Sequence, residues 1–245
     1  MSKSFVVTGA SGGVGSAIAA HLASLGNTVV NLDPGPQQDA HPGVHHVRAD
    51  AGDWDAALAA AELAETHAPL SGWVNNAAVF RDASLATAPP GEVGALIAEN
   101  LNLALVGCQT AVRHFLAHSR PGSIVNVSSH QAQRPVRGAL PYATAKAAIE
   151  GLTRAAAVDH GPQGIRVNAV ALGSITTARY EEYRREHPDA DLQMAAVHPL
   201  GHVGQPRDVA QAVAFLLSPE SGFISGAVLP VDGGRSALGP DPESA

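Results

Sequence analysis

The chain has 245 residues, and its 15 Lys and Arg residues against 22 Asp and Glu residues give a formal net charge of −7. This charge argues against a nucleic acid or an acidic membrane as the main partner, because both would repel it. Hydrophobic residues make up 45% of the chain and charged residues 15%, as in a compact folded protein. The single cysteine, Cys108, excludes an intrachain disulfide and a zinc site built on several thiolates. We therefore expect a cytoplasmic protein without a signal peptide or membrane-spanning segment, since no uninterrupted apolar run approaches 18 residues.

Short β-branched or apolar runs alternate with Ala- and Leu-rich stretches along the chain. The runs predict buried strands at 5–7, 28–32, 44–49, 73–76, 124–127, 167–171 and 228–231. The stretches predict helices at approximately 14–25, 53–67, 92–118, 141–160 and 207–218. This alternation indicates a parallel sheet covered by helices on both faces. The sequence thus predicts an α/β fold, a single doubly wound Rossmann-like domain over residues 1–238 with about seven parallel strands.

Three segments depart from this alternation. Between Asp33 and Val44 three prolines leave little room for a regular crossover helix, so we expect a loop or a single turn. Residues 174–200 are rich in Tyr, Arg and Glu and match no strand, which predicts a helical insertion that acts as a substrate lid. Residues 239–245 are expected to form a frayed C-terminal tail.

A glycine-rich turn directly follows the first predicted strand. Residues 8–15 read Thr-Gly-Ala-Ser-Gly-Gly-Val-Gly and lead into a predicted amphipathic helix. Glycines let the backbone turn tightly and let a pyrophosphate approach the N–H groups and positive dipole at a helix start. The spacing of Gly9, Gly13 and Gly15 is GxxxGxG, so on its own it fits either a dinucleotide site or a merely structural turn.

The second predicted strand ends at Asp33, which indicates a preference for NAD. A carboxylate at this place accepts hydrogen bonds from the adenosine ribose hydroxyls and repels a 2′-phosphate. Neither Ser11-Gly12 nor Pro34-Gly35 offers a cation that would pair with such a phosphate. The alternative is that Asp33 is an ordinary turn residue before a proline.

Tyr142, Lys146 and Ser129 form a candidate catalytic group. Tyr142 and Lys146 are four residues apart, so they share a face of the predicted helix, and an ammonium near a phenol favours the tyrosinate. Ser129 follows a strand and lies 13 residues before Tyr142, where its hydroxyl can hold a substrate oxygen. The Tyr-Lys pair alone is weak evidence, because most such pairs are surface neighbours.

Together these motifs resemble those of the short-chain dehydrogenase/reductase family, and the match runs from about residue 4 to residue 236. This resemblance implies that Tyr142 is the general acid/base, that Ser129 orients the substrate oxygen, and that Lys146 holds the nicotinamide ribose and lowers the pKa of Tyr142. It implies that Asn100 keeps a water in the proton relay, with Asn102 as the nearby alternative. The residues that carry the match are 8–15, Asp50, 75–78, Asn100, Ser129, 142–146, 166–170, 173–177 and 231–234.

The resemblance also implies a cofactor site and an assembly. Asp50 and Ala51 should lie at the adenine, Asn76 and Ala77 at the adenine ribose, and Gly173, Ile175 and Thr177 at the nicotinamide. A homotetramer is implied, with helices near 92–118 and 141–160 pairing across subunits through Ala-rich faces. The full set of expected cofactor residues is Gly9, Ser11, Gly13, Val14, Gly15, Asp33, Asp50, Ala51, Asn76, Ala77, Tyr142, Lys146, Gly173, Ile175 and Thr177.

Two positions differ from the family pattern. Ala78 stands where the family usually has glycine, and Leu172 stands where it usually has proline. The first puts a methyl group next to the expected cofactor, and the second frees the backbone before the nicotinamide loop. We expect both to tune cofactor affinity or lid ordering, with neutral drift as the alternative.

Several other side chains have two interpretations. His130 is a candidate substrate contact beside Ser129 and Tyr142, or a loop residue that merely follows the strand. His114 and His118 share a helix face, but no third ligand follows at useful spacing, so we expect no metal site. Cys108 has no basic neighbour in sequence, which favours a packed thiol over a nucleophile. Arg134, Arg137 and Arg179 could meet an anionic substrate group, although solvent is favoured.

We therefore predict an NAD-dependent oxidoreductase that interconverts a secondary alcohol and its ketone, a small-molecule substrate that the sequence does not identify. One alternative is an NADP-type reductase of 3-oxoacyl thioesters. The other is a protein that senses a dinucleotide without catalysis, but a sensor has no need of Ser129, Tyr142, Lys146 and Asn100.

Overall fold

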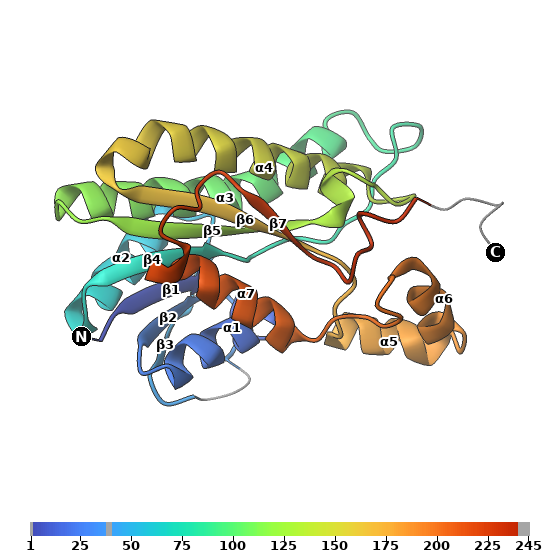
Figure 1. The fold of residues 1–245 in the computed structure, drawn as a ribbon. Coiled ribbons are helices and arrows are strands. Elements are labelled where there is room, and N and C mark those ends of the chain that lie inside the picture. The colour runs from blue at the N-terminus through green and yellow to red at the C-terminus, as the bar shows by residue number, and fades with distance from the viewer. Residues whose placement is uncertain (1, 38–40, 240–245) are drawn as a thin grey trace.

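The structure, a computed structural model, describes residues 2–37 and 41–239. A single sheet of seven parallel strands runs through them in the order β3-β2-β1-β4-β5-β6-β7, which confirms the predicted doubly wound α/β fold (Figure 1). The predicted strands agree with the structure to within a few residues at each end. The strands are β1 (Ser4–Thr8), β2 (Thr28–Leu32), β3 (Val44–Val47), β4 (Leu70–Asn75), β5 (Gly122–Ser129), β6 (Ile165–Leu172) and β7 (Val228–Val231).

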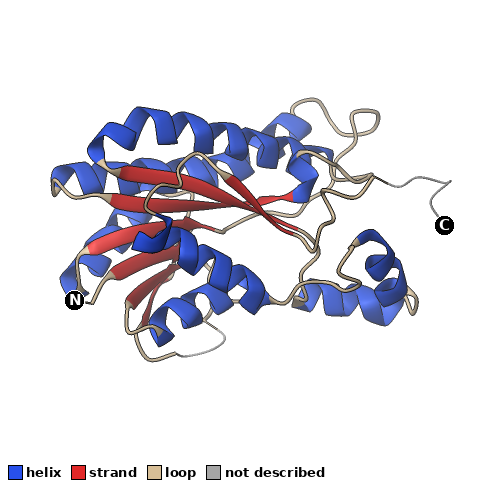
Figure 2. Ribbon diagram, in the orientation of Figure 1, coloured by secondary structure: helices blue, strands red, loops and turns tan. Residues whose placement is uncertain are grey.

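Helices cover both faces of this sheet (Figure 2). In Figure 1, α3 and α4 lie on one side of the sheet, and α1 and α7 lie on the other. The helices are α1 (Gly13–Ser24), α2 (Trp54–His67), α3 (Glu92–Ala117), α4 (Leu140–His160), α5 (Ala178–Glu186), α6 (Ala190–Val197) and α7 (Pro206–Leu217). Short 3₁₀ turns occupy His130–Ala132, Gly161–Gln163 and Pro219–Ser221.

Two hydrophobic cores, one on each face, hold the layers together. Side chains alternate along a strand, so Val6 points into the core under α2 and α3, while Phe5 and Val7 point into the core under α1 and α7. All three are almost fully buried, as expected for a strand of a parallel sheet with both faces covered.

α3 is long and apolar enough, by length and composition alone, to cross a membrane, but 56% of its most apolar window is buried inside the fold. Trp73 and Phe115 are both fully buried in the core that this helix shares with the sheet. Packing on the sheet therefore accounts for its apolar character.

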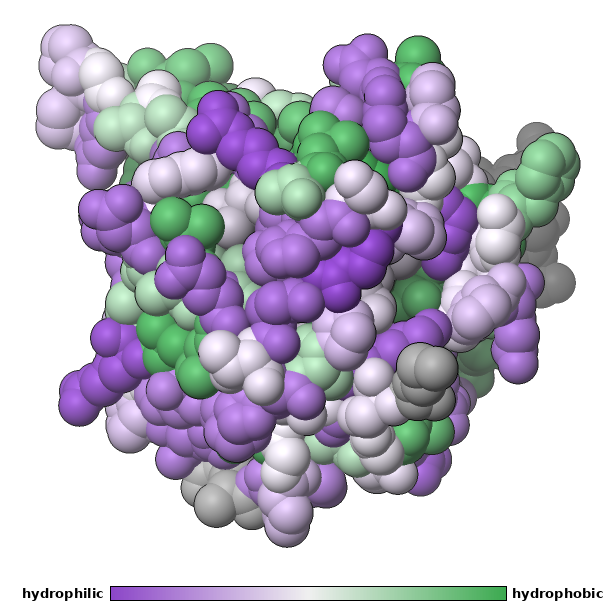
Figure 3. All heavy atoms as spheres, turned by 90° about the vertical axis from the view of Figure 1, so that its left-hand side faces the viewer, coloured by the Kyte–Doolittle hydropathy of each residue, from purple (hydrophilic) through white to green (hydrophobic). Residues whose placement is uncertain are grey.

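The order of the strands indicates at which end of the sheet a ligand should bind. The chain crosses over between β1 and β4, and in open α/β sheets ligands bind outside the carboxyl ends of the strands at such a switch point. The opposite face of the molecule, which carries the N-terminus, shows small hydrophobic patches separated by hydrophilic residues (Figure 3).

The irregular segments also follow the sequence analysis. Residues 33–37 and 41–43 form turns and bends without a helix, and residues 38–40 lie outside the described part of the chain. The predicted helical insertion is present as α5 and α6, which lie beyond the sheet in Figure 1. Tyr180 joins the two helices through its Oη, which donates to Asp191 Oδ1 at 2.7 Å. Of the predicted C-terminal tail, only Gly239 is among the described residues.

Glu65 of α2 ties three elements together. Its Oε2 accepts hydrogen bonds from Leu70 N at the start of β4, from Arg120 after α3, and from His114 Nε2 in α3. Partial burial alone would raise the pKa of Glu65, but the hydrogen bonds from Arg120, His114 and Leu70 outweigh it and lower the pKa to about 2.

Replacing Glu65 with glutamine should therefore destabilise the fold in a pH-dependent way. A carboxylate with a lowered pKa stabilises the folded state above its ordinary pKa of 4.5, and this contribution is lost as the pH falls from 4.5 towards about 2. We expect Glu65→Gln to lower the urea midpoint at pH 7 and the difference from wild type to shrink at pH 3. Equal urea midpoints of wild type and Glu65→Gln at pH 7 would show that the three hydrogen bonds add nothing to the net stability of the folded state.

Candidate active site

A cleft of about 740 Å³ opens at the carboxyl ends of the strands. It extends from the glycine-rich turn after β1 to the start of α4 and the start of α5. Ala78 and Leu172, the two departures from the family pattern, both line it. The expected site residues that line it are Gly9, Gly13, Val14, Gly15, Asp33, Asp50, Ala51, Asn76, Ala77, Tyr142, Lys146 and Thr177. The expected residues that are not among its lining are Ser11, Asn100, Ser129, His130, Gly173 and Ile175.

The glycine-rich turn has the shape that a phosphate site needs. Gly9 has φ +67°, and a Cβ added there would lie 2.8 Å from Ala77 Cα. A Cβ on Gly15 would lie 2.2 Å from the carbonyl oxygen of Gly9, so neither position tolerates a side chain. Gly13 has φ +58° and faces open space, with Thr177 Cγ2 across the cleft at 3.8 Å from the added Cβ. The turn therefore leaves room for a ligand in front of the start of α1.

Asn76 fixes this turn against β4. Its Nδ2 donates to the carbonyl oxygens of Thr8 at 3.0 Å and Gly9 at 2.9 Å. The Thr8 hydroxyl in turn accepts hydrogen bonds from the backbone N–H groups of Asn76 and Ala77, each at 3.0 Å. Asn76 and Ala77 thus shape the cleft from behind the turn as well as lining it.

Asp33 stands at one end of the cleft, at the end of β2. Its Oδ2 accepts from Ser11 N at 3.1 Å and its Oδ1 accepts from Gly35 N at 2.7 Å. Ser11 also donates from its hydroxyl to the carbonyl oxygen of Gly35 at 3.1 Å, so it supports this wall of the site without lining the cleft. The structure adds a cation that sequence spacing did not reveal, because Arg48 Nε donates to the carbonyl oxygen of Pro34 at 3.1 Å.

Asp50 and Ala51, which follow the neighbouring strand β3, line the cleft at the same end. Asp50 Oδ1 accepts from Gly52 N at 2.7 Å, and Ala51 is 2% exposed. Asn102 belongs to this end as well, since its Nδ2 donates to the carbonyl oxygen of Gly52 at 3.2 Å. The cleft thus carries two carboxylates at the end away from α4.

Tyr142, Ser129 and Lys146 come together at the other end. Tyr142 comes from α4 and Ser129 from the end of β5, and the two side chains lie close enough that the Ser129 hydroxyl lowers the pKa of Tyr142. Lys146 Nζ lies 5.4 Å from the centre of the Tyr142 ring and donates to the carbonyl oxygen of Val127 at 2.7 Å. The helical spacing of Tyr142 and Lys146 and the position of Ser129 at a strand end produce this group.

The pKa of Tyr142 differs from the sequence expectation. Burial raises it to about 12, against the opposing effects of the Ser129 hydrogen bond and the positive charge of Arg179. The expected lowering by Lys146 is not found, because the Lys146 ammonium is directed at Val127 O and is itself buried. Burial lowers the pKa of Lys146 to about 8.

The side chain of Asn100 is hydrogen-bonded to the loop that follows β4. Its Oδ1 accepts from Val79 N at 3.0 Å, and its Nδ2 donates to the carbonyl oxygens of Val79 at 3.0 Å and Leu96 at 3.2 Å. Both of its amide N–H groups are therefore used. Since Val79 lines the cleft, the side chain of Asn100 positions the cleft wall.

His130, Gly173 and Ile175 lie behind the cleft. His130 Nδ1 hydrogen-bonds the carbonyl oxygen of Leu172 at 3.1 Å, and its ring is almost fully buried. Gly173 packs on Asp232, whose Cα would lie 2.8 Å from an added Cβ, so this packing alone requires a glycine. Ile175 forms an isolated bridge with Gly204.

Phe80 is a cleft residue that the sequence did not mark, and Arg179, for which a substrate contact was the less favoured interpretation, also lines the cleft. The Phe80 ring centre lies 4.9 Å from that of Tyr142, and Arg179 Cζ lies 4.6 Å above the Phe80 ring. Arg179 has no carboxylate within ion-pair distance among residues 2–37 and 41–239. Phe80 follows no motif, and Arg179 was one of several arginines in a segment whose path the sequence did not define.

Comparison with known proteins agrees with this geometry. A family model described as enoyl-(acyl carrier protein) reductase matches residues 9–236. The (3R)-3-hydroxyacyl-CoA dehydrogenase of Mus musculus is 34% identical, with 94% of this chain and 94% of the relative covered. The ligand-free aldohexose dehydrogenase of Thermoplasma acidophilum has a TM-score of 0.91 at 32% identity, with 100% and 98% covered. A putative 2-deoxy-d-gluconate 3-dehydrogenase from Agrobacterium tumefaciens with bound NADP has a TM-score of 0.85 at 28% identity, with 96% and 97% covered.

The chain belongs to the short-chain dehydrogenase/reductase family. It is an NAD(P)-dependent oxidoreductase that interconverts hydroxyl and carbonyl groups of small molecules.

Proposed function

We propose that this protein uses NAD to interconvert a secondary alcohol and its ketone, with Tyr142 as the general acid/base. One observation carries the proposal: Tyr142 and the buried Lys146 line one end of the cleft, with Ser129 beside Tyr142, and Asp33 lines the opposite end. A dinucleotide can extend from one end of such a cleft to the other, with its adenosine at the Asp33 end and its nicotinamide at the reacting carbon.

The residues of the cleft fit this cofactor. The open space before Gly13 would receive the pyrophosphate, and Asp33 would accept hydrogen bonds from the adenosine ribose. Lys146 would hold the nicotinamide ribose, and Thr177 would lie on the nicotinamide side. When bound, the nicotinamide ring supplies the chemistry of hydride transfer at the substrate carbon.

Tyr142 and Ser129 would handle the proton and the substrate oxygen. With a pKa of about 12, the Tyr142 phenol is protonated at neutral pH, which suits donation of a proton to a carbonyl oxygen. For alcohol oxidation the phenol must first lose its proton, and the nearby positive charge of Arg179 favours that loss. Ser129 Oγ would hold the substrate oxygen as its charge changes.

An NADP-dependent reductase of acyl thioesters is the second candidate function. Arg48 at Pro34 is a cation close to Asp33, and a 2′-phosphate would need such a partner. Asp33 nevertheless lines the cleft and Arg48 does not, which favours NAD.

Replacing Asp33 with alanine tests the cofactor preference. We expect wild type to prefer NAD and Asp33→Ala to reduce the ratio of kcat/KM for NAD over NADP by about tenfold or more, which corresponds to about 1.4 kcal/mol. Asp50→Ala is the matched control, because it removes a cleft carboxylate at the adenine and should weaken both cofactors alike. A wild-type preference for NADP would contradict this interpretation of Asp33.

We also propose a homotetramer in which α3 and α4 pair across subunits. Leu105 and Leu116 of α3 and Val158 of α4 are exposed apolar side chains, which supports association through these helices. Light scattering on the purified protein should give four times the chain mass, and a monomer mass would contradict it.

A further inference from the structure

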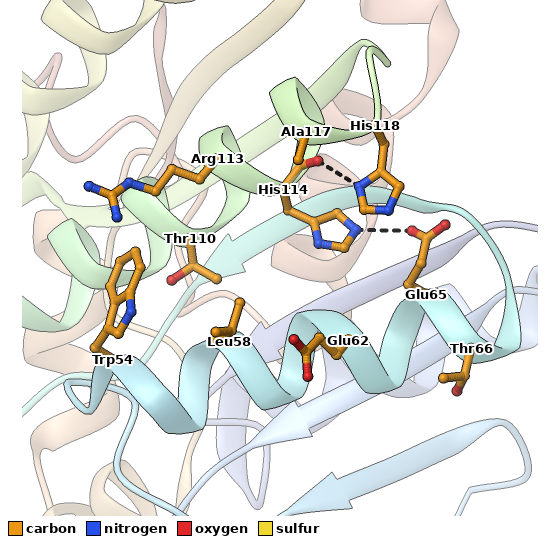
Figure 4. A pocket seen from close by; sticks show the side chains of 10 residues that line it. All are labelled: Trp54, Leu58, Glu62, Glu65, Thr66, Thr110, Arg113, His114, Ala117 and His118. Carbon is orange, nitrogen blue, oxygen red and sulfur yellow. Dashed lines mark hydrogen bonds and ion pairs between the residues drawn. The ribbon is translucent and has the colours of Figure 1, made fainter.

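A second hollow lies between α2 and α3 and shares no lining residue with the active-site cleft (Figure 4). Its volume is about 540 Å³. Figure 4 shows Glu65 of α2 pointing towards His114 of α3 and towards His118, which directly follows α3. One ligand atom from each of these three residues lies within 4.8 Å of the other two.

His114 and His118 each have a ring nitrogen within reach of the other two residues of the cluster. His118 Nδ1 donates to the carbonyl oxygen of His114 at 2.9 Å, which leaves the Nε2 lone pair of His118 unused. The two rings are stacked with their centres 4.3 Å apart. His114 Nε2 lies 3.0 Å from Glu65 Oε2.

The carboxylate of Glu65 is held in place from behind. Arg120 donates to Oε2 at 2.7 Å and Leu70 N donates to the same oxygen at 2.9 Å. Glu65 Oε1 has no hydrogen-bond partner among the described residues. Metal-binding carboxylates are commonly fixed by such outer hydrogen bonds, which leave the second oxygen to the ion.

Thr110 gives an independent indication that the hollow receives a polar ligand. It lies one turn before His114 on α3, is 1% exposed and lines the same hollow. Its Oγ1 has no hydrogen-bond partner in the described part of the chain. Buried hydroxyls are almost always hydrogen-bonded, so an unpaired one indicates a bound water or polar group in this hollow. In Figure 4 this hydroxyl points towards Trp54, at the end of the hollow away from the two histidines.

We propose that Glu65, His114 and His118 form a three-residue binding site for Zn²⁺. Two imidazole nitrogens and one carboxylate oxygen are a common zinc ligand set, with the fourth position open to water. Ligands at zinc bond lengths of about 2.0–2.2 Å in a tetrahedron are roughly 3.4 Å apart. The ligand atoms of Glu65, His114 and His118 lie within 4.8 Å of one another, so modest side-chain rotations would bring them to this spacing.

Zinc binding at this place replaces a hydrogen bond by two metal bonds. Zinc needs the lone pair of His114 Nε2, so the proton that Nε2 donates to Glu65 must leave it. A neutral imidazole then carries its proton on Nδ1 instead, whereas a protonated imidazole releases one proton to solvent, so binding weakens at acidic pH. The occupied site would join α2 to the C-terminal end of α3. The proposed site would correct the expectation of no metal site, because the third ligand comes from another helix, 49 residues before His114.

Zinc binding by the full-length protein tests the site. Protein freed of metal with a chelator is titrated with ZnCl₂ in competition with a chromogenic chelator, for wild type, His118→Ala and His187→Ala. The matched control is His187, which also donates from Nδ1 to the carbonyl oxygen four residues earlier, at 2.9 Å, and stacks on an aromatic ring, but has no part in the cluster.

We expect wild type and His187→Ala to bind one Zn²⁺ per chain with equal affinity, and His118→Ala to bind at least about tenfold more weakly. Zn²⁺ should raise the thermal midpoint of the first two proteins and leave that of His118→Ala unchanged, because only a ligand that binds the folded state stabilises it. Mg²⁺, which prefers oxygen ligands, should shift none of them. Equal zinc affinity of His118→Ala and wild type, or the absence of zinc binding by wild type, would overturn the proposal.

Discussion

Replacing Tyr142 with phenylalanine will reduce turnover about 100- to 10,000-fold, the usual contribution of a positioned general acid/base. The substitution removes only the hydroxyl, whose partner is Ser129, and leaves the ring against Phe80 and Lys146. Steady-state rates with a responsive secondary alcohol and either cofactor measure the loss. Because Tyr142 Oη is the proposed site of proton transfer, kcat should fall with kcat/KM.

Tyr183→Phe is the matched control for this variant. Tyr183 of α5 stacks on His187, which follows the helix, and neither residue lines the cleft, so loss of the Tyr183 hydroxyl should leave turnover unchanged. Cofactor affinity measured by nicotinamide fluorescence should stay close to wild type in Tyr142→Phe. Wild-type turnover of Tyr142→Phe would contradict the assignment of the proton to Tyr142.

Replacing Lys146 with methionine should have two opposite effects, a loss of activity and a gain in stability. Activity should fall at least about tenfold, because the variant lacks both the cation near the Tyr142 phenol and the proposed ribose contact. Stability should rise, because burial lowers the pKa of Lys146 to about 8, and holding the ammonium inside the fold at pH 7 opposes folding by on the order of 3 kcal/mol. Methionine fills a similar volume without this penalty, and losing the bond to Val127 O offsets only about 1 kcal/mol.

The stability gain should depend on pH in a defined way. The folded state binds the Lys146 proton less tightly than the unfolded chain, so the penalty is full below pH 8 and fades as the pH rises towards 10.5. Urea midpoints of wild type and Lys146→Met should therefore differ at pH 7 and converge near pH 10. A midpoint for Lys146→Met that lies below wild type at pH 7 would contradict the destabilising role of the buried ammonium.

The fold followed from the sequence because its signals are local. Each strand is a short β-branched run between Ala- and Leu-rich stretches, and alternating strands and helices leave a parallel sheet as the only simple arrangement. The glycine-rich turn and the Tyr142–Lys146 pair are also local patterns, and the structure brings both to one cleft. The absence of a helix after Asp33 was also predictable from a local signal, the three prolines between Asp33 and Val44.

What the sequence missed depends on contacts between distant segments. The pKa of Tyr142 is set mainly by burial, which no spacing reveals, and Arg179 reaches Phe80 only because the start of α5 lies at the cleft. Arg48 reaches Pro34 across neighbouring strands. Glu65 meets His114 and His118 because α2 and α3 pack side by side, so a search for a third ligand along α3 alone overlooks it.

The most direct test of the proposed function follows the formation of reduced cofactor with a panel of secondary alcohols, sugars, hydroxy acids and cyclic diols. Wild type and Tyr142→Phe are compared, each with NAD and with NADP. We predict that wild type oxidises at least one class of alcohol, faster with NAD than with NADP. The rate of Tyr142→Phe with the same alcohol should be at least about 100-fold lower. Oxidation by Tyr142→Phe at the wild-type rate, or a wild-type enzyme that works better with NADP, would contradict it.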